Sequence, residues 1–164
     1  MKPVRPDKKF LLSHPAHLLA FGFGAGLLPK APGTWGTLVA FPIFALVRLG
    51  GTPVVVAAAI LLFVVGVWAS DVAGRSLGVV DHGGIVIDEI AAFLLVLACT
   101  PASVIWWVIA FLLFRVFDIV KPWPIRWADR TLKSGFGVMF DDVLAAGYAI
   151  GGIVLMRSLA NAIL

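Results

Sequence analysis

Charged residues are scarce in this sequence of 164 residues, since Asp, Glu, Lys and Arg make up only 13% of it. In soluble domains the charged share is about 25%. Hydrophobic residues supply 61% of the chain, and the mean hydropathy is +1.04. This composition excludes an ordinary water-soluble domain and predicts an integral membrane protein. We expect a single membrane-embedded domain over residues 1–164, with a basic cytoplasmic segment at 1–13.

Cysteine is nearly absent as well. The single Cys99 lies in an apolar run, which excludes an intrachain disulfide and a metal site built from cysteines. The net charge of +4 is modest, and many of the basic residues flank apolar stretches. Basic residues in that position attract anionic membrane lipids, so we expect lipid partners and no nucleic acid.

Long stretches without charge are the main structural signal. About 20 apolar residues in a helix, rising ~1.5 Å each, cross a hydrocarbon core of about 30 Å. Residues 52–70 give the clearest span, whereas the uncharged stretch 90–114 is interrupted at Pro101 and predicts a helical hairpin. We therefore predict an all-α, polytopic membrane helical bundle. It has about five crossings, over residues 35–49, 52–70, 85–99, 103–120 and 143–164.

The first apolar stretch, residues 17–28, is too short to cross a bilayer. Several glycines break it, and Pro29 and Pro32 close it. Irregular backbone at membrane depth needs a protein neighbour or a wet cavity to satisfy it. We predict a short interfacial or re-entrant helix near a functional site, and a flexible connector is the alternative.

Basic residues set the predicted orientation. They precede the first crossing and recur between the fourth and the fifth, at Lys2, Arg5, Lys8, Lys9, Lys30, Lys121, Arg126, Arg130 and Lys133. Loops rich in Lys and Arg stay on the cytoplasmic side. The N-terminus and the loops 70–84 and 121–142 are therefore predicted to be cytoplasmic.

Acidic residues gather at the same predicted face. All but one of the nine lie in or beside those two loops, and the ones at helix ends are Asp88, Glu89, Asp118, Asp141 and Asp142. Carboxylates at membrane depth are costly unless a hard divalent cation neutralises them, so we predict that these five residues bind Mg²⁺. Within each adjacent pair we expect one ligand and one supporting residue, because neighbouring helical side chains point about 100° apart. A structural ion network with nearby cations is the alternative.

Cations interleaved with these acids predict phosphate binding, and they are Arg115, Lys121, Arg126 and Arg130. Arginine binds phosphate oxygens through its fork, and lysine acts as a point charge. Carboxylates for Mg²⁺ beside cations for phosphate are what phosphoryl chemistry requires. For the arginines and the nearby tryptophans, an interfacial anchor is the alternative.

The segment 30–37 is a second predicted phosphate contact. Lys30 offers a cation, Thr34 and Thr37 offer hydroxyls, and Gly33 leaves backbone amides open. We predict that this segment cradles the headgroup phosphate. The alternative is that Thr34 merely caps the first span.

The catalytic residues predicted from this pattern are Asp88, Asp118, Asp142 and His82. His82 is either a general acid for the leaving alkoxide or simply a loop histidine. A thiol phosphatase is excluded, because Ile105 stands where an arginine is needed six residues after Cys99, and no Asp-x-Asp motif indicates an aspartyl-phosphate enzyme. A metal-activated water, or less readily an aspartate, is left as the nucleophile.

Four stretches together resemble the phosphatidylglycerophosphatase A family. They are 17–26 (HLLAFGFGAG), 31–37 (APGTWGT), 81–89 (DHGGIVIDE), and 114–130 (FRVFDIVKPWPIRWADR) followed by 137–142 (GVMFDD). The resemblance implies a Mg²⁺-dependent hydrolase of phospholipid biosynthesis that removes the terminal phosphate of phosphatidylglycerophosphate in the bacterial inner membrane. From the residues alone, a small transporter of cations or phosphate is the alternative, although the uncharged mid-spans argue against an ion pathway. The oligomeric state is not predicted.

Overall fold

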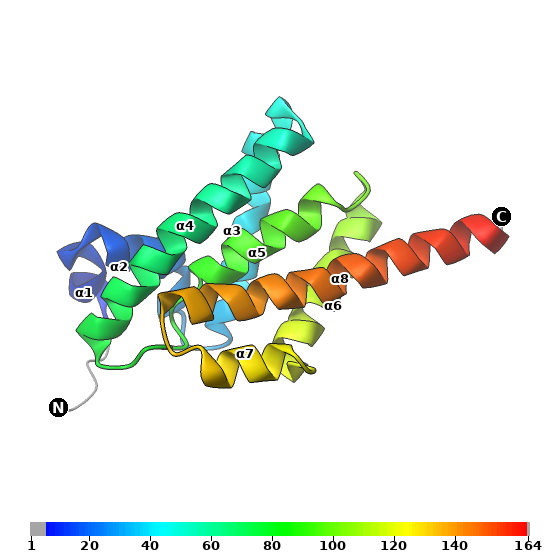
Figure 1. Cartoon of the computed structure of the whole chain (residues 1–164). Coiled ribbons are helices and arrows are strands. Elements are labelled where there is room, and N and C mark those ends of the chain that lie inside the picture. Colours follow the sequence, from blue (N-terminus) through cyan, green and yellow to red (C-terminus); the bar gives the residue numbers. More distant parts are fainter. Residues whose placement is uncertain (1–5, 164) are drawn as a thin grey trace.

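The computed structural model describes residues 6–163, and no strand occurs in that range (Figure 1). Lys2 and Arg5 of the predicted basic segment lie outside the described residues. The elements are α1 (Lys8–Ser13), α2 (Pro15–Ala20), the 3-10 helix η1 (Gly22–Leu27), α3 (Pro32–Val47), the 3-10 helix η2 (Arg48–Gly50), α4 (Thr52–Leu77), α5 (Ile87–Ala98), α6 (Val104–Val120), α7 (Ile125–Thr131) and α8 (Gly135–Ile163).

Three helical segments within residues 6–163 are long and apolar enough to cross a membrane, namely Pro32–Gly50, Thr52–Leu77 and Gly135–Ala162. They confirm the prediction of an all-α, polytopic membrane bundle. The hairpin predicted around Pro101 is also present, as α5 and α6. These two helices have 12 and 17 residues. Because such helices are about 18 and 26 Å long, shorter than a hydrocarbon core of about 30 Å, their separate crossings stay a prediction.

Two helices extend further than their uncharged stretches. α4 continues past residue 70 to Leu77, where Gly78 ends it with a left-handed φ of 72°. α8 begins at Gly135 rather than at residue 143. The acidic pair Asp141 and Asp142 therefore lies inside α8 and not in the loop before it.

α5 is the central helix of the bundle. Figure 1 shows it between α4 and α8, and it also packs against α3. Residues on all of its faces are buried, including Ile90, Phe93 and Leu94, each at most 3% exposed. A helix that is apolar on all of its faces is typical of a buried position, so the sequence of α5 fits its place at the centre of the bundle. Its first turn consequently carries Asp88 and Glu89 into the interior.

The glycine-rich segment before α3 is irregular, as predicted. Within η1, Phe23 and Gly24 have φ of 56° and 107°. η1 packs against the loop that leads into α5, since a Cβ on Gly26 would overlap the carbonyl oxygen of Gly84. This contact makes η1 a packed element rather than a flexible connector. Its depth in the bilayer stays a prediction.

Candidate active site

Three acidic side chains from two helices converge in the interior. Asp88 and Glu89 come from the first turn of α5, and Asp142 comes from the early part of α8. One carboxylate oxygen of each residue lies within 4.8 Å of the other two. All three residues are buried, and Asp142 has only 3% of its surface exposed. We call Asp88, Glu89 and Asp142 the carboxylate cluster.

Each member of the carboxylate cluster has an oxygen without a partner. Asp88 Oδ1, Glu89 Oε2 and Asp142 Oδ2 are buried and accept no hydrogen bond from the described residues. Unpaired buried charges of one sign are strongly unfavourable. A hard divalent cation prefers several carboxylate oxygens, so the cluster fits such an ion and can hold it. Both members of the pair Asp88 and Glu89 reach the cluster, and their division into one ligand and one supporting residue stays a prediction.

Arg115 and Asp118 of α6 border the cluster. Arg115 Nη1 lies 2.7 Å from Asp118 Oδ2 and 3.7 Å from Glu89 Oε1. Asp118 carries its charge close to Glu89 and Asp142. Arg115 Nε is buried without an acceptor among the described residues. The arginine therefore neutralises part of the acidic charge and keeps one donor free.

The first turn of α3 closes another side of the site. A Cβ on Gly33 would overlap Glu89 Oε1 and lie 3.1 Å from Arg115 Nη2. The hydroxyl of the buried Thr37 donates to the Gly33 carbonyl at 2.9 Å and accepts from Arg115 Nη1 at 3.3 Å. Only a glycine lets the α3 backbone approach the carboxylates this closely.

The alternative in which Thr34 caps the first span is wrong. The N-cap of α3 is Ala31, in the left-handed region with φ 49°, and no described side chain caps this end. Thr34 lies inside the first turn, and its amide donates to the Ala31 carbonyl at 2.9 Å. Lys30 is exposed just before the helix. The start of α3 therefore places uncapped helix N–H groups near the carboxylate cluster.

Lys121 belongs to a separate ion group. Its Nζ lies 2.8 Å from Asp129 Oδ1 and 2.5 Å from Asp141 Oδ2. Burial lowers the pKa of Lys121, but the hydrogen bonds and charges of Asp129 and Asp141 outweigh burial and raise the pKa above its usual range. Asp141 thus faces Lys121, while its neighbour Asp142 faces the cluster. The two ion pairs of Lys121 match the alternative considered from the sequence, in which acidic residues and nearby cations form a structural ion network.

The other predicted phosphate cations lie on α7. Ile125 and Ala128 are its buried face, whereas Arg126 and Arg130 are exposed. Both arginines line a surface hollow of about 440 Å³, which they share with tryptophans 123 and 127. Arg126 Nη2 also donates to the carbonyl of Val120 at 3.1 Å. We call this feature the arginine hollow, and it is distinct from the carboxylate cluster.

His82 lies in the loop between α4 and α5. Its Nδ1 accepts a hydrogen bond from the Gly84 amide at 3.0 Å. This bond requires an unprotonated Nδ1, so a neutral His82 carries its proton on Nε2. The ring is half-buried, near Phe21. The loop therefore fixes the tautomer of His82.

Asp71 has a role that sequence reasoning missed. The amide of Gly135, the first residue of α8, donates to Asp71 Oδ1. A Cβ on Gly135 would overlap the backbone carbonyl oxygen of Val67, so a glycine lets α8 start directly beside α4. A carboxylate also stabilises a helix N-terminus. Asp71 thereby helps to fix the start of α8 and, through it, the position of Asp142. No local pattern in the sequence pairs residues 71 and 135.

Comparison with known proteins places the chain in one family. The model of the Phosphatidylglycerophosphatase A family matches residues 18–157. A phosphatidylglycerophosphatase A of Haemophilus influenzae is 46% identical over 92% of this chain and 93% of its own length, and one of Escherichia coli is 40% identical over 85% and 82%. A Bacteroides thetaiotaomicron protein, provisionally described as a phosphatidylinositol-3-phosphatase, is 36% identical over 85% and 92%. No solved structure matches the chain significantly. The chain belongs to the phosphatidylglycerophosphatase A family, a family of membrane phosphatases.

Proposed function

We propose that the protein hydrolyses phosphatidylglycerophosphate to phosphatidylglycerol and inorganic phosphate, with Mg²⁺ as its cofactor. The observation that carries this proposal is the carboxylate cluster, in which Asp88, Glu89 and Asp142 bring three unpartnered oxygens into the interior. Two relatives with this activity in their names cover more than four-fifths of the chain. The transporter alternative is not favoured, because the relatives are phosphatases.

The carboxylate cluster would hold the metal, with Asp118 beside it. Bound Mg²⁺ supplies positive charge that offsets the charge of the phosphate and of the leaving oxygen. Arg115 offers its free Nε donor to a phosphate oxygen, while Asp118 and Thr37 hold its fork in place. The protein thus presents a fixed cation next to the carboxylates, as phosphoryl transfer needs.

Helix α3 contributes the second part of the phosphate site. Its uncapped N–H groups and its helix dipole favour an anion, and Gly33 brings this turn against Glu89 and Arg115. Lys30 and Thr34 add a charge and a hydroxyl at the same end. Arg126 and Arg130 attract the remaining anionic part of the headgroup from the arginine hollow.

His82 is the proposed general acid. It would give its Nε2 proton to the leaving alkoxide from the imidazolium form, in which Nδ1 is also protonated and releases the hydrogen bond from the Gly84 amide. The attacking group is a water or one of the aspartates. We place the N-terminus and the site at the cytoplasmic face of the bacterial inner membrane, on the basis of the Lys and Arg residues that flank the spans.

The test is phosphate release from phosphatidylglycerophosphate by the purified protein in detergent micelles. We expect turnover with Mg²⁺, loss of turnover after chelation, and recovery when Mg²⁺ is added back. Phosphatidylinositol 3-phosphate serves as the comparison substrate, because one relative is provisionally assigned to that lipid. Full turnover after bound metal has been stripped would reject the metal site, and turnover of the inositol lipid alone would reject the substrate.

A further inference from the structure

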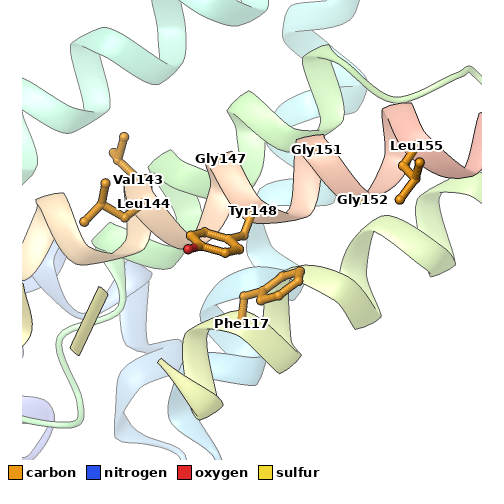
Figure 2. Close-up of a pocket in the computed structure, with 8 residues that line it drawn as sticks. All are labelled: Phe117, Val143, Leu144, Gly147, Tyr148, Gly151, Gly152 and Leu155. Atoms are coloured by element: carbon orange, nitrogen blue, oxygen red, sulfur yellow. The ribbon is translucent and has the colours of Figure 1, made fainter. Parts of the chain in front are cut away.

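An open apolar groove of about 590 Å³ runs along α8 where this helix packs on α6. Figure 2 shows Phe117 of α6 on one side and the α8 residues on the other, with the rings of Phe117 and Tyr148 next to each other. The ring centroids of these two residues lie 5.2 Å apart. The α8 side of the groove includes Val143, Gly147, Gly151 and Leu155.

Two glycines create this groove. A Cβ on Gly147 or Gly151 would meet no atom of the described chain within 4 Å. Gly152 differs, because a Cβ there would lie 3.3 Å from Leu113 of α6, so this glycine serves helix packing. Glycine destabilises a helix interior relative to alanine. Packing within the chain therefore explains Gly152, whereas Gly147 and Gly151 leave the surface of α8 open along the groove.

The end of the groove at Phe117 and Val143 adjoins the candidate active site. Phe117 directly precedes Asp118, and Val143 directly follows Asp142. The hydroxyl of Tyr148 donates to the Trp123 carbonyl at 2.8 Å, and Trp123 lines the arginine hollow. One end of the groove is therefore next to carboxylates and exposed arginines, and the groove itself is almost wholly apolar.

The length of the groove matches one leaflet of a bilayer. From Val143 to Leu155 the helix rises about 18 Å, at ~1.5 Å per residue. Half of a hydrocarbon core is about 15 Å thick. A polar, cationic end joined to an apolar track one leaflet deep complements an anionic phospholipid. A helix from a second copy would not require the track to begin at the headgroup residues.

We infer that this groove binds an acyl chain of the phospholipid substrate, while the headgroup lies at the carboxylate cluster and the arginine hollow. The inference rests on the proposed function and adds a subsite for the apolar part of the lipid. Tyr148 is a positioning residue here, because its hydrogen bond to Trp123 joins the groove to the start of the headgroup site. The groove then favours a phospholipid over a water-soluble phosphate that has the same headgroup and no acyl chains.

Filling the groove tests this subsite. In Gly151→Leu the new side chain lies in the groove, and leucine favours the helix, so the variant is expected to fold. Blocking contact with a few methylenes should raise KM for dipalmitoyl phosphatidylglycerophosphate about tenfold, with little change for the dihexanoyl lipid. The matched control is Val154→Leu, which adds bulk at an exposed α8 position outside the groove and should leave both KM values unchanged.

Labelling separates failure of the groove from failure of the proposed activity. Phosphatidylglycerol with a photoreactive diazirine on its acyl chain should label the α8 peptide of the wild type, and Gly151→Leu should reduce that labelling. Absence of turnover with groove labelling intact would reject the proposed function and keep the lipid site. Unchanged labelling and kinetics in Gly151→Leu, or equal effects on both chain lengths, would overturn the subsite. Chemical cross-linking of the wild type and Gly151→Leu gives a further check. If Gly151→Leu abolishes a cross-linked dimer of the wild type without any chain-length effect on KM, the groove belongs to a second copy and the acyl-chain subsite is overturned.

Discussion

The backbone of Gly33 lies directly against the carboxylate of Glu89, so closely that a Cβ on residue 33 would overlap Oε1. The two residues are far apart in the sequence, and the contact joins the start of α3 to the start of α5. It makes the first turn of α3 a wall of the carboxylate cluster. The size of residue 33 therefore controls the position of Glu89.

The first prediction follows from this contact. In Gly33→Ala the added methyl group must displace Glu89, and we expect turnover to fall about a hundredfold because small displacements of catalytic groups have effects of that size. Helix stability should not fall, since alanine is favoured over glycine within a helix. Phosphate release and thermal unfolding of the two proteins provide the measurement. The control is Gly83→Ala, whose methyl group would meet no described atom within 4 Å. Equal turnover in Gly33→Ala and wild type would contradict the close approach.

The second prediction concerns the unpaired charges of the carboxylate cluster. Asp142→Asn should lower turnover by roughly a thousandfold or more, as loss of a charge-stabilising group at a reacting centre does. In the metal-free protein the same change should raise the free energy of unfolding by about 1 kcal/mol or more, because Asp142 is a buried carboxylate next to two others and has no cationic partner among the described residues. Asp88→Asn and Asp118→Asn should also reduce turnover, although Asp118→Asn removes the nearer of the two carboxylate partners of Arg115 and should not gain stability.

Mg²⁺ adds a separate readout for the same variants. An ion present at 100 times its dissociation constant stabilises the folded state by about 2.7 kcal/mol, so Mg²⁺ should raise the Tm of the wild type. Asp142→Asn should lose most of this increase. Asp7→Asn is the matched control, since Asp7 caps α1 away from the cluster and asparagine caps equally well. If Asp142→Asn has the turnover and the Mg²⁺ response of the wild type, the carboxylate cluster does not bind the metal and has a structural role.

Much of the bundle could be predicted from the sequence, because uncharged runs and Pro101 mark α3 to α6 directly. The limits of α4 and α8 could not, since both helices continue through charged residues beyond their uncharged runs. Asp88, Glu89 and Asp142 were predicted as one site, and the structure brings them together. The direction of Asp141 depends instead on where α7 folds back against α8 and presents Asp129 to Lys121, which is a long-range contact that no local pattern encodes.

The third prediction decides between two roles for Lys121. Its two ion pairs indicate a structural role, so Lys121→Met should lower the free energy of unfolding by about 1 to 3 kcal/mol, less than for a fully buried pair because the side chain is partly exposed. Adding Asp141→Asn should recover part of this loss. If Lys121 instead binds substrate, Lys121→Met will raise KM with an unchanged Tm.

The pH dependence of this ion group gives a second check. The pKa of Lys121 lies above its usual range in the folded protein, so its contribution is fully present below the unfolded pKa of about 10.4 and is lost only as pH rises further. The stability difference between wild type and Lys121→Met should therefore not decrease from neutral pH to about pH 9. Unfolding measured across that range tests it, and a difference that disappears near neutral pH would contradict the raised pKa.

The last prediction concerns the phosphate contact at the start of α3. Thr34 is not the N-cap of this helix, so Thr34→Ala should change the free energy of unfolding by much less than the ~1 kcal/mol that a lost cap costs. If the turn binds the headgroup phosphate, Thr34→Ala and Lys30→Ala should raise KM while Tm stays constant. Lys30→Arg retains the charge and should recover most of the affinity for substrate, whereas Lys30→Gln should not. A loss of stability with unchanged kinetics in these variants would leave the start of α3 as a structural element, and phosphate would then be held by Arg115 and the α7 arginines alone.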